Sequence, residues 1–103
     1  MIRVSVMYPN SDGLRFDMKY YMDKHVPMVG DLLGDALKGA SVDAGISGGE
    51  PDSTAPYVAM AHLSFDSVDA FQTAFGPHAE KIMADIPNYT DAKPIIQISD
   101  VKA

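Results

Sequence analysis

The alternation of apolar and polar side chains along the chain predicts four β-strands. It is clearest over residues 2–8, 57–65 and 95–101, where β-branched and aromatic residues are frequent. A fourth strand is expected over residues 37–46, where small residues make the pattern weaker. Turn-forming residues close the first strand, and residues 47–53 form a connecting loop rich in Gly and Ser.

The first predicted helix begins after Asp17 and carries one apolar stripe. Asp is a preferred N-cap residue, and Phe16 and Tyr21 occupy positions that form a hydrophobic staple around such a cap. At about 100° per residue, Met18 and His25 point to the same side of the helix, beside Tyr21. The pattern therefore places His25 in the stripe that faces the rest of the molecule.

Pro27 interrupts this helical pattern. Proline lacks a backbone N–H and disfavours helical angles in the residue before it, so regular helix is expected to end or kink close to His25. Helical periodicity resumes over residues 28–33 and stops at Gly34, a residue suited to a helix C-terminus.

The second half of the chain repeats this order of elements. A second helix is predicted over residues 67–75, after the same Phe-Asp pair that precedes the first, and residues 79–85 add two turns after a Gly-Pro break. Two strand–helix–strand units with right-handed crossovers predict a single α+β domain over residues 1–103, with a ferredoxin-like βαββαβ fold. Its four-stranded antiparallel sheet carries the helices on one face.

The other face of this sheet has no covering element. The predicted strands nevertheless carry apolar residues on both faces, as with Ile96 and Ile98 on one side of the last strand and Ile95 on the other. An exposed antiparallel face should instead be polar. We therefore expect a homodimer formed through the open sheet face, stabilised by the apolar area that it buries.

Composition and charge exclude several functional classes. The 14 acidic and 8 basic residues give a net charge of -6 without any Lys or Arg cluster, which argues against nucleic acid and anionic membrane surfaces as partners. The chain has no cysteine, and no apolar run reaches the ~18 residues of a membrane span. Strand-like residues begin at Ile2 and leave no room for a signal peptide. These features predict a soluble, cytoplasmic protein.

His25 is the first candidate for chemistry. Within the apolar stripe it is either a core histidine whose ring bonds a backbone carbonyl, or an acid–base group in a cleft between helix and sheet. Tyr8, Tyr21 and Met22 are candidates to line such a cleft, although aromatic and Met residues at helical spacing also serve as plain core. No carboxylate partner for His25 can be assigned from the sequence.

The other two histidines indicate no catalytic role. His62 falls on the strand face opposite Phe65, where we expect a structural or interface histidine, and His78 follows Pro77 and is expected to be exposed. The histidines lack the spacing of a metal site, so no metal is expected. Residues 45–49 match the Gly-x-Ser-x-Gly motif of a nucleophile elbow. That motif requires a helix directly after it, and a loop is predicted here, so we expect a flexible connection instead of a catalytic serine.

Four stretches of the chain resemble the EthD family: Tyr8-Pro9-Asn10, Phe16-Asp17-x-x-Tyr20-Tyr21-x-x-x-His25-x-Pro27, residues 57–71 and Ala84-Asp85-Ile86-Pro87-Asn88-Tyr89-Thr90. The resemblance covers most of the chain, and the Tyr-Tyr…His-x-Pro stretch is its most specific part. It implies a dimeric α/β barrel associated with the catabolism of ethers and of aromatic or polyketide compounds. Members are often labelled EthD family reductase, an oxidoreductase name, but this sequence has no flavin or nicotinamide fingerprint.

The resemblance also implies a role for the histidine. Related barrels isomerise lactones or dehydrate and cyclise polyketides without a cofactor, so His25 would be the proton-transfer group, with Tyr21 nearby. We therefore expect a small apolar carbonyl or aromatic compound in the helix–sheet cleft and no cofactor. Two alternatives stay open: a non-catalytic binding or accessory protein for an oxygenase or degradation system, and a purely structural dimer.

Overall fold

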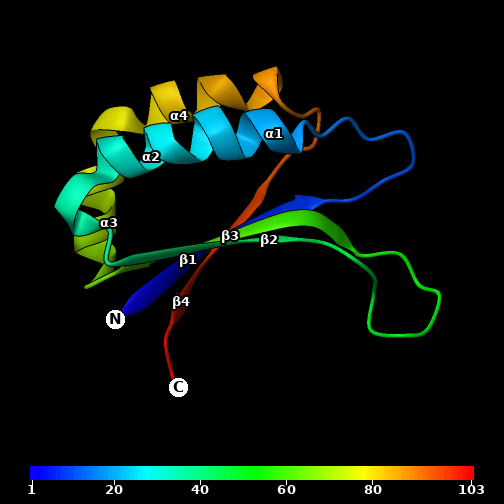
Figure 1. Ribbon diagram of the computed structural model, residues 1–103. Coiled ribbons are helices and arrows are strands. Elements are labelled where there is room, and N and C mark those ends of the chain that lie inside the picture. Colours follow the sequence, from blue (N-terminus) through cyan, green and yellow to red (C-terminus); the bar gives the residue numbers. More distant parts are fainter.

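The computed structural model describes residues 1–103, and a four-stranded sheet forms its centre (Figure 1). The strands are β1 (Ile2–Pro9), β2 (Gly39–Ala44), β3 (Tyr57–Phe65) and β4 (Ile95–Asp100). Their order is β2-β3-β1-β4, and every neighbouring pair is antiparallel. This is the arrangement of a ferredoxin-like βαββαβ domain, so the predicted fold class is confirmed.

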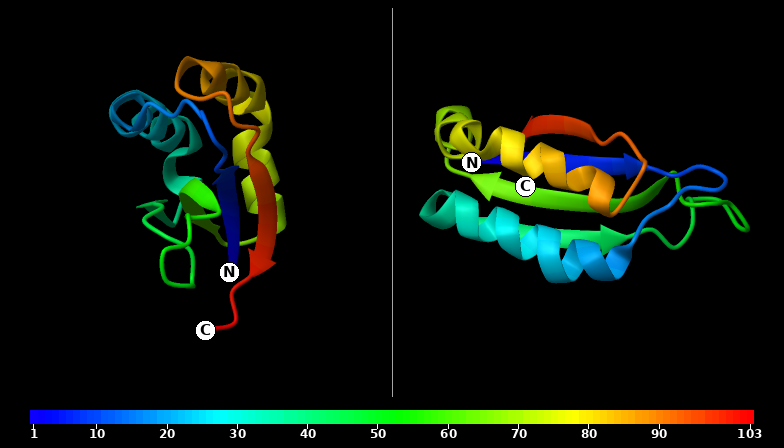
Figure 2. Two further views of the ribbon diagram at one scale, coloured as in Figure 1. Left: turned by 90° about the vertical axis from the view of Figure 1, so that its right-hand side faces the viewer. Right: turned by 90° about the horizontal axis from the view of Figure 1, so that it is seen from above.

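Two helical runs connect the strands and lie on one face of the sheet (Figures 1 and 2). The first consists of α1 (Met18–Tyr20), a π-helical turn (Tyr21–His25) and α2 (Val26–Leu33), and the second of α3 (Val68–Phe75) and α4 (Ala79–Asp85). Short 3-10 segments end or join these runs at Gly34–Ala36, Gly76–His78 and Ile86–Asn88. No helix is both long and apolar enough to cross a bilayer.

The helices begin at side chains that cap them. The Asp17 carboxylate accepts a hydrogen bond from the backbone N–H of Tyr20 at 3.0 Å, and the Phe16 and Tyr21 rings meet edge to face with centroids 5.3 Å apart. The predicted N-cap and staple are thus confirmed. Ser67 caps the second run in the same way, because its hydroxyl accepts a hydrogen bond from the backbone N–H of Ala70 at 3.0 Å.

The π turn explains how the first helix passes Pro27. The N–H of Val26 bonds to the carbonyl of Tyr21, five residues back, and α2 then starts with Pro27 in its first turn. A first-turn N–H has no partner within its own helix, so proline costs little there. Regular α-helical bonding is therefore interrupted close to His25, as predicted, and the interruption is a π turn within a continuous helical run.

Other predicted bounds lie close to the observed ones. The first run ends at Gly34, whose φ of 58° falls in the left-handed region that glycine tolerates. Strand β2 is shorter than the predicted 37–46, because a 3-10 turn precedes it and the Gly-rich loop follows it.

The core lies between the helices and the sheet. One cluster of buried side chains consists of Tyr8, Tyr21, Ala59, Ile86 and Tyr89, and a second of Val4, Leu33 and Phe65. Because Phe65 packs under the helices, alternation along β3 places His62 on the open face, as predicted.

The open face of the sheet is more polar than the sequence pattern indicated. The strand register assigns it these polar side chains: Arg3, Ser5, Ser41, Asp43, His62, Ser64, Gln97 and Ser99. One apolar row crosses it, formed by Met7 with its paired neighbours Met60 and Ile95. The expectation of a largely apolar open face is therefore wrong.

Two isoleucines of β4 do not contribute to the open face. Ile96 pairs with Val6 and Ile98 with Val4, so both isoleucines lie on the helix side of the sheet, where they remain 46% and 42% exposed. The apolar surface of these two side chains thus lies at the β4 edge, next to the helices.

Candidate functional site

His25 lies on the inner side of the first helical run, as the apolar stripe predicted. It ends the π turn and is only 5% exposed. Tyr21, four residues earlier, stacks on it with an interplanar angle of 17° and ring centroids 5.6 Å apart. Single π turns are frequent at functional sites, because they change the direction of a side chain within a helix.

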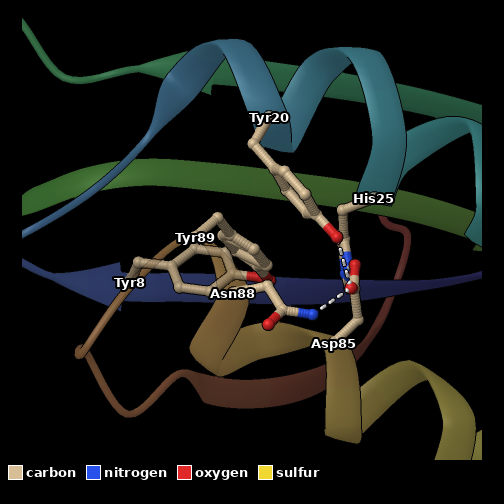
Figure 3. A network of polar contacts seen from close by, with 6 residues as sticks. All are labelled: Tyr8, Tyr20, His25, Asp85, Asn88 and Tyr89. Carbon is tan, nitrogen blue, oxygen red and sulfur yellow. Dashed lines mark hydrogen bonds and ion pairs between the residues drawn. The ribbon is translucent and has the colours of Figure 1, made fainter.

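Asp85, at the end of α4, is the partner of His25 (Figure 3). Its Oδ2 lies 2.9 Å from His25 Nδ1. Its other oxygen, Oδ1, accepts hydrogen bonds from the Tyr20 hydroxyl at 2.7 Å and from the Asn88 side-chain amide at 2.9 Å. Burial alone would raise the pKa of Asp85, but the hydrogen bonds from Asn88, Tyr20 and His25 outweigh burial and lower it. The carboxylate is therefore ionised at neutral pH.

This contact defines which nitrogen of the imidazole carries hydrogen. An ionised carboxylate can only accept, so Nδ1 carries the hydrogen and donates it to Asp85. In the neutral ring, Nε2 then presents a lone pair. Nε2 makes no hydrogen bond within the chain, and no buried side-chain polar atom lacks a partner, so Nε2 is accessible from outside the protein core.

A cavity of about 150 Å³ lies beside this ring, between the helices and the sheet. Only His25, Tyr8 and Tyr21 contribute polar side-chain atoms to its wall, and no charged side chain lines it. The apolar lining comes from both layers: Val4, Val6, Val26, Val29, Leu37, Ala40, Val42, Ala61, Leu63, Phe71, Phe75, Ile82, Met83, Ile86, Pro94 and Ile96. Such a cavity, apolar apart from a few polar side chains at one place, is typical of a small-molecule site.

Tyrosine rings hold the inner end of this site in place. The hydroxyls of Tyr8 and Tyr89 lie 2.8 Å apart, and the Tyr89 ring lies 4.7 Å from that of His25, centroid to centroid. Burial raises the pKa of Tyr8, Tyr21 and Tyr89. These phenols therefore stay protonated and serve as hydrogen-bond groups.

Comparison with known proteins identifies the family. The family model of the EthD domain matches residues 14–93. The chain belongs to the EthD family. The matched range of this EthD chain contains Tyr20, Tyr21, His25, Asp85 and Asn88. No curated protein matches it.

Solved structures agree with this assignment. An EthD-like protein from Ralstonia eutropha JMP134 is 42% identical to this EthD chain, with a TM-score of 0.95 over 99% of this chain and 92% of the other. An EthD family protein from Bacillus halodurans C-125 is 15% identical, with a TM-score of 0.70 over 99% of both chains. A dimeric ferredoxin-like protein from Thermobifida fusca YX is 15% identical, with a TM-score of 0.65 over 97% and 90%. The last two show the fold alone.

The EthD structure brings most of the predicted site residues together. His25, Tyr8 and Tyr21 share one cavity wall. Met22 does not: it is 42% exposed and lies outside the cavity, so the expectation that it forms a wall is wrong. Because Met22 directly follows Tyr21, it points about 100° away from that ring around the helix.

Sequence reasoning missed the group that orients His25. Asp85 lies 60 residues away in the chain, and no local pattern joins the two. The available signal was the spacing of Asp85 and Asn88, three residues apart at a helix end, which lets the amide reach the carboxylate. The same EthD stretch contains Tyr89, whose ring contacts that of His25.

The remaining histidines of this EthD domain lie apart from the cavity. On the open face, His62 Nδ1 lies 2.9 Å from Ser5 Oγ, and its Nε2 lies 3.3 Å from Asp43. The order resembles a Ser-His-Asp triad, but Ser5 sits in the central strand, whose backbone pairs with both neighbours and leaves no N–H pair for an oxyanion. His78 is half-buried rather than exposed as predicted.

Proposed function

We propose that this EthD protein binds a small apolar molecule in the cavity and that His25 transfers a proton to and from it without a cofactor. The observation that carries this proposal is the His25–Asp85 pair at the wall of an otherwise apolar cavity. The catabolic role that the resemblance implies, on ether, aromatic or polyketide-type compounds, agrees with a lining of this kind.

The geometry supplies both halves of a proton shuttle. Nε2 accepts a proton from the bound molecule, and the ionised Asp85 stabilises the imidazolium through Nδ1–H. The apolar wall offers water few hydrogen-bond partners, which strengthens the attraction between carboxylate and imidazolium. When the proton returns at a different atom, the net reaction is an isomerisation, which needs no oxidant or reductant.

Hydrogen–deuterium exchange tests this function. Small cyclic ketones, 1,3-diketones and lactones are incubated with the protein in D2O, and deuterium at carbon is followed by NMR. For a compound that the protein exchanges, His25→Ala is expected to lower the rate about 10²- to 10⁴-fold, because it removes the acid–base group. Met22→Ala, outside the cavity, is the matched control and should leave the rate unchanged. Equal rates in the wild type and His25→Ala would refute the proposal.

Ligand capture without turnover is a second candidate function. The nearly complete apolar lining favours it, because burial of apolar surface is enough to bind a small molecule. In that case a compound that binds in the cavity would show no exchange above the rate in buffer, in the wild type as well as in the variant.

We also propose that two copies associate through the open sheet face. Support comes from the apolar row of Met7, Met60 and Ile95, and from a likeness to the dimeric Thermobifida fusca protein. Placing a charge at the centre of this row should separate the copies, since a buried unpaired charge is costly. Met7→Asp is therefore expected to halve the molar mass seen by light scattering, and Lys24→Glu on the exposed helix surface should leave it unchanged. A monomeric wild-type protein at about 100 μM would contradict the proposal, because stable interfaces hold together at such concentrations.

A further inference from the structure

We infer that the ligand of this cavity is an uncharged six-membered ring that carries one hydroxyl group or the carbonyl tautomer of that hydroxyl. The inference rests on the proposed function in one respect, since it takes the cavity beside His25 as the binding site. It adds the size, the charge and the polar group of the molecule that this site accepts.

The size follows from the volume of the cavity. Pockets for drug-sized molecules measure about 300–1,000 Å³, whereas an apolar cavity of about 150 Å³ is known to take up benzene. The cavity here has a volume of about 150 Å³. One ring therefore fills it, and a larger ligand would extend past exposed residues of its lining such as Met83 and Ile96.

The charge follows from the side chains that line the cavity. None of them is Lys, Arg, Asp or Glu, and the Asp85 carboxylate is already engaged by His25, Tyr20 and Asn88. A carboxylate or phosphate on the ligand could pair only with a protonated His25, whose charge the Asp85 carboxylate already balances, in a chain whose net charge is -6. An ammonium group would find no free carboxylate. The site therefore selects a neutral molecule.

The polar group follows from the hydrogen on His25. Since Nδ1 donates to Asp85, the free Nε2 of the neutral ring is an acceptor and pairs with a ligand that donates an O–H. Flat walls suited to a ring come from Tyr21, which stacks on His25, and from Phe71 and Phe75, which stack on each other.

A hydroxylated ring is also a substrate for the proposed proton transfer. Starting from the dienone tautomer, Nε2 removes a proton from the saturated ring carbon, and the C–H electron pair becomes a ring double bond. The carbonyl π electrons move to oxygen, which then takes the proton back from the imidazolium to give the phenol. Atoms and electrons balance, so the step is an isomerisation that uses no further reactant.

Equilibrium binding tests the ligand class. Dissociation constants of phenol, methoxybenzene and benzoate are measured by NMR titration at pH 7.5, with wild type, His25→Ala and Met22→Ala. Phenol is expected to bind to the wild type and to Met22→Ala alike, and benzoate should show no binding at concentrations that saturate with phenol. In His25→Ala the affinity for phenol relative to methoxybenzene should fall at least tenfold, because only phenol donates to Nε2.

Two results would overturn the inference. One is benzoate binding as tightly as phenol to the wild type, a comparison that needs no variant to fold. The other is a phenol-to-methoxybenzene ratio that does not change in His25→Ala, provided that the variant gives a dispersed NMR spectrum. The deuterium-exchange experiment tests proton transfer independently. A protein that shows these affinities but no exchange would contradict the proposed function and leave the ligand class intact.

Discussion

Asp85→Asn is expected to slow proton transfer by His25 by up to about 10⁴-fold, the loss seen when the carboxylate that orients a catalytic histidine is replaced by its amide. The amide keeps the shape of the carboxylate but can donate to His25 Nδ1. The hydrogen of the neutral ring then moves to Nε2, which can no longer accept a proton from a ligand. The rate of deuterium exchange at carbon, measured with a compound that the wild type exchanges, checks this result.

Tyr20→Phe serves as a control that distinguishes loss of His25 orientation from a general loss of the hydrogen bonds around Asp85. Tyr20→Phe removes one of the two donors to Asp85 Oδ1 and leaves the contact between Oδ2 and Nδ1 in place, so its rate should fall less than about tenfold. Binding of phenol to Asp85→Asn should persist, because a protonated Nε2 can donate to the phenol oxygen. A rate for Asp85→Asn within tenfold of the wild type would show that the carboxylate does not select the reactive form of the ring.

The fold could be predicted because its signals are local. Asp17 caps its helix through a backbone N–H three residues on, and the apolar stripe that turns His25 inward can be read within two helical turns. The repeated strand–helix–strand order then leaves few ways to arrange the sheet. Each of these signals depends on residues less than ten positions apart, where sequence spacing determines geometry.

The rest of the site depends on contacts between distant segments. Asp85 reaches His25 only after the two helical runs are placed side by side on the sheet, and spacing within either run carries no information on that contact. Which side chains the open face carries also depends on contacts between distant segments. A shift of one residue in register exchanges the faces of a strand, so the side taken by Ile96 and Ile98 is decided by their pairing with β1.

Tyr89→Ala is expected to lower the free energy of unfolding by about 3–5 kcal/mol, the range for deleting a buried aromatic ring. Tyr89 is fully buried, its ring contacts those of Tyr8, Tyr21 and His25, and its carbonyl accepts the N–H of Asp17 at the start of the first helix. For a domain of about this size each kcal/mol corresponds to about 4–8 °C, so the melting temperature should fall by at least about 12 °C. Thermal unfolding followed by circular dichroism measures this shift.

Tyr89→Phe is the matched control for that result. It keeps the ring and its packing, and it removes only the hydroxyl that lies 2.8 Å from the hydroxyl of Tyr8. The cost should be about 1–3 kcal/mol, because the Tyr8 hydroxyl is left buried without this partner. Similar losses in both variants would mean that the hydroxyl pair, rather than the ring, holds the helices against the sheet at His25. A much larger loss for Ala assigns that role to the ring, and through it the position of the imidazole at the cavity wall.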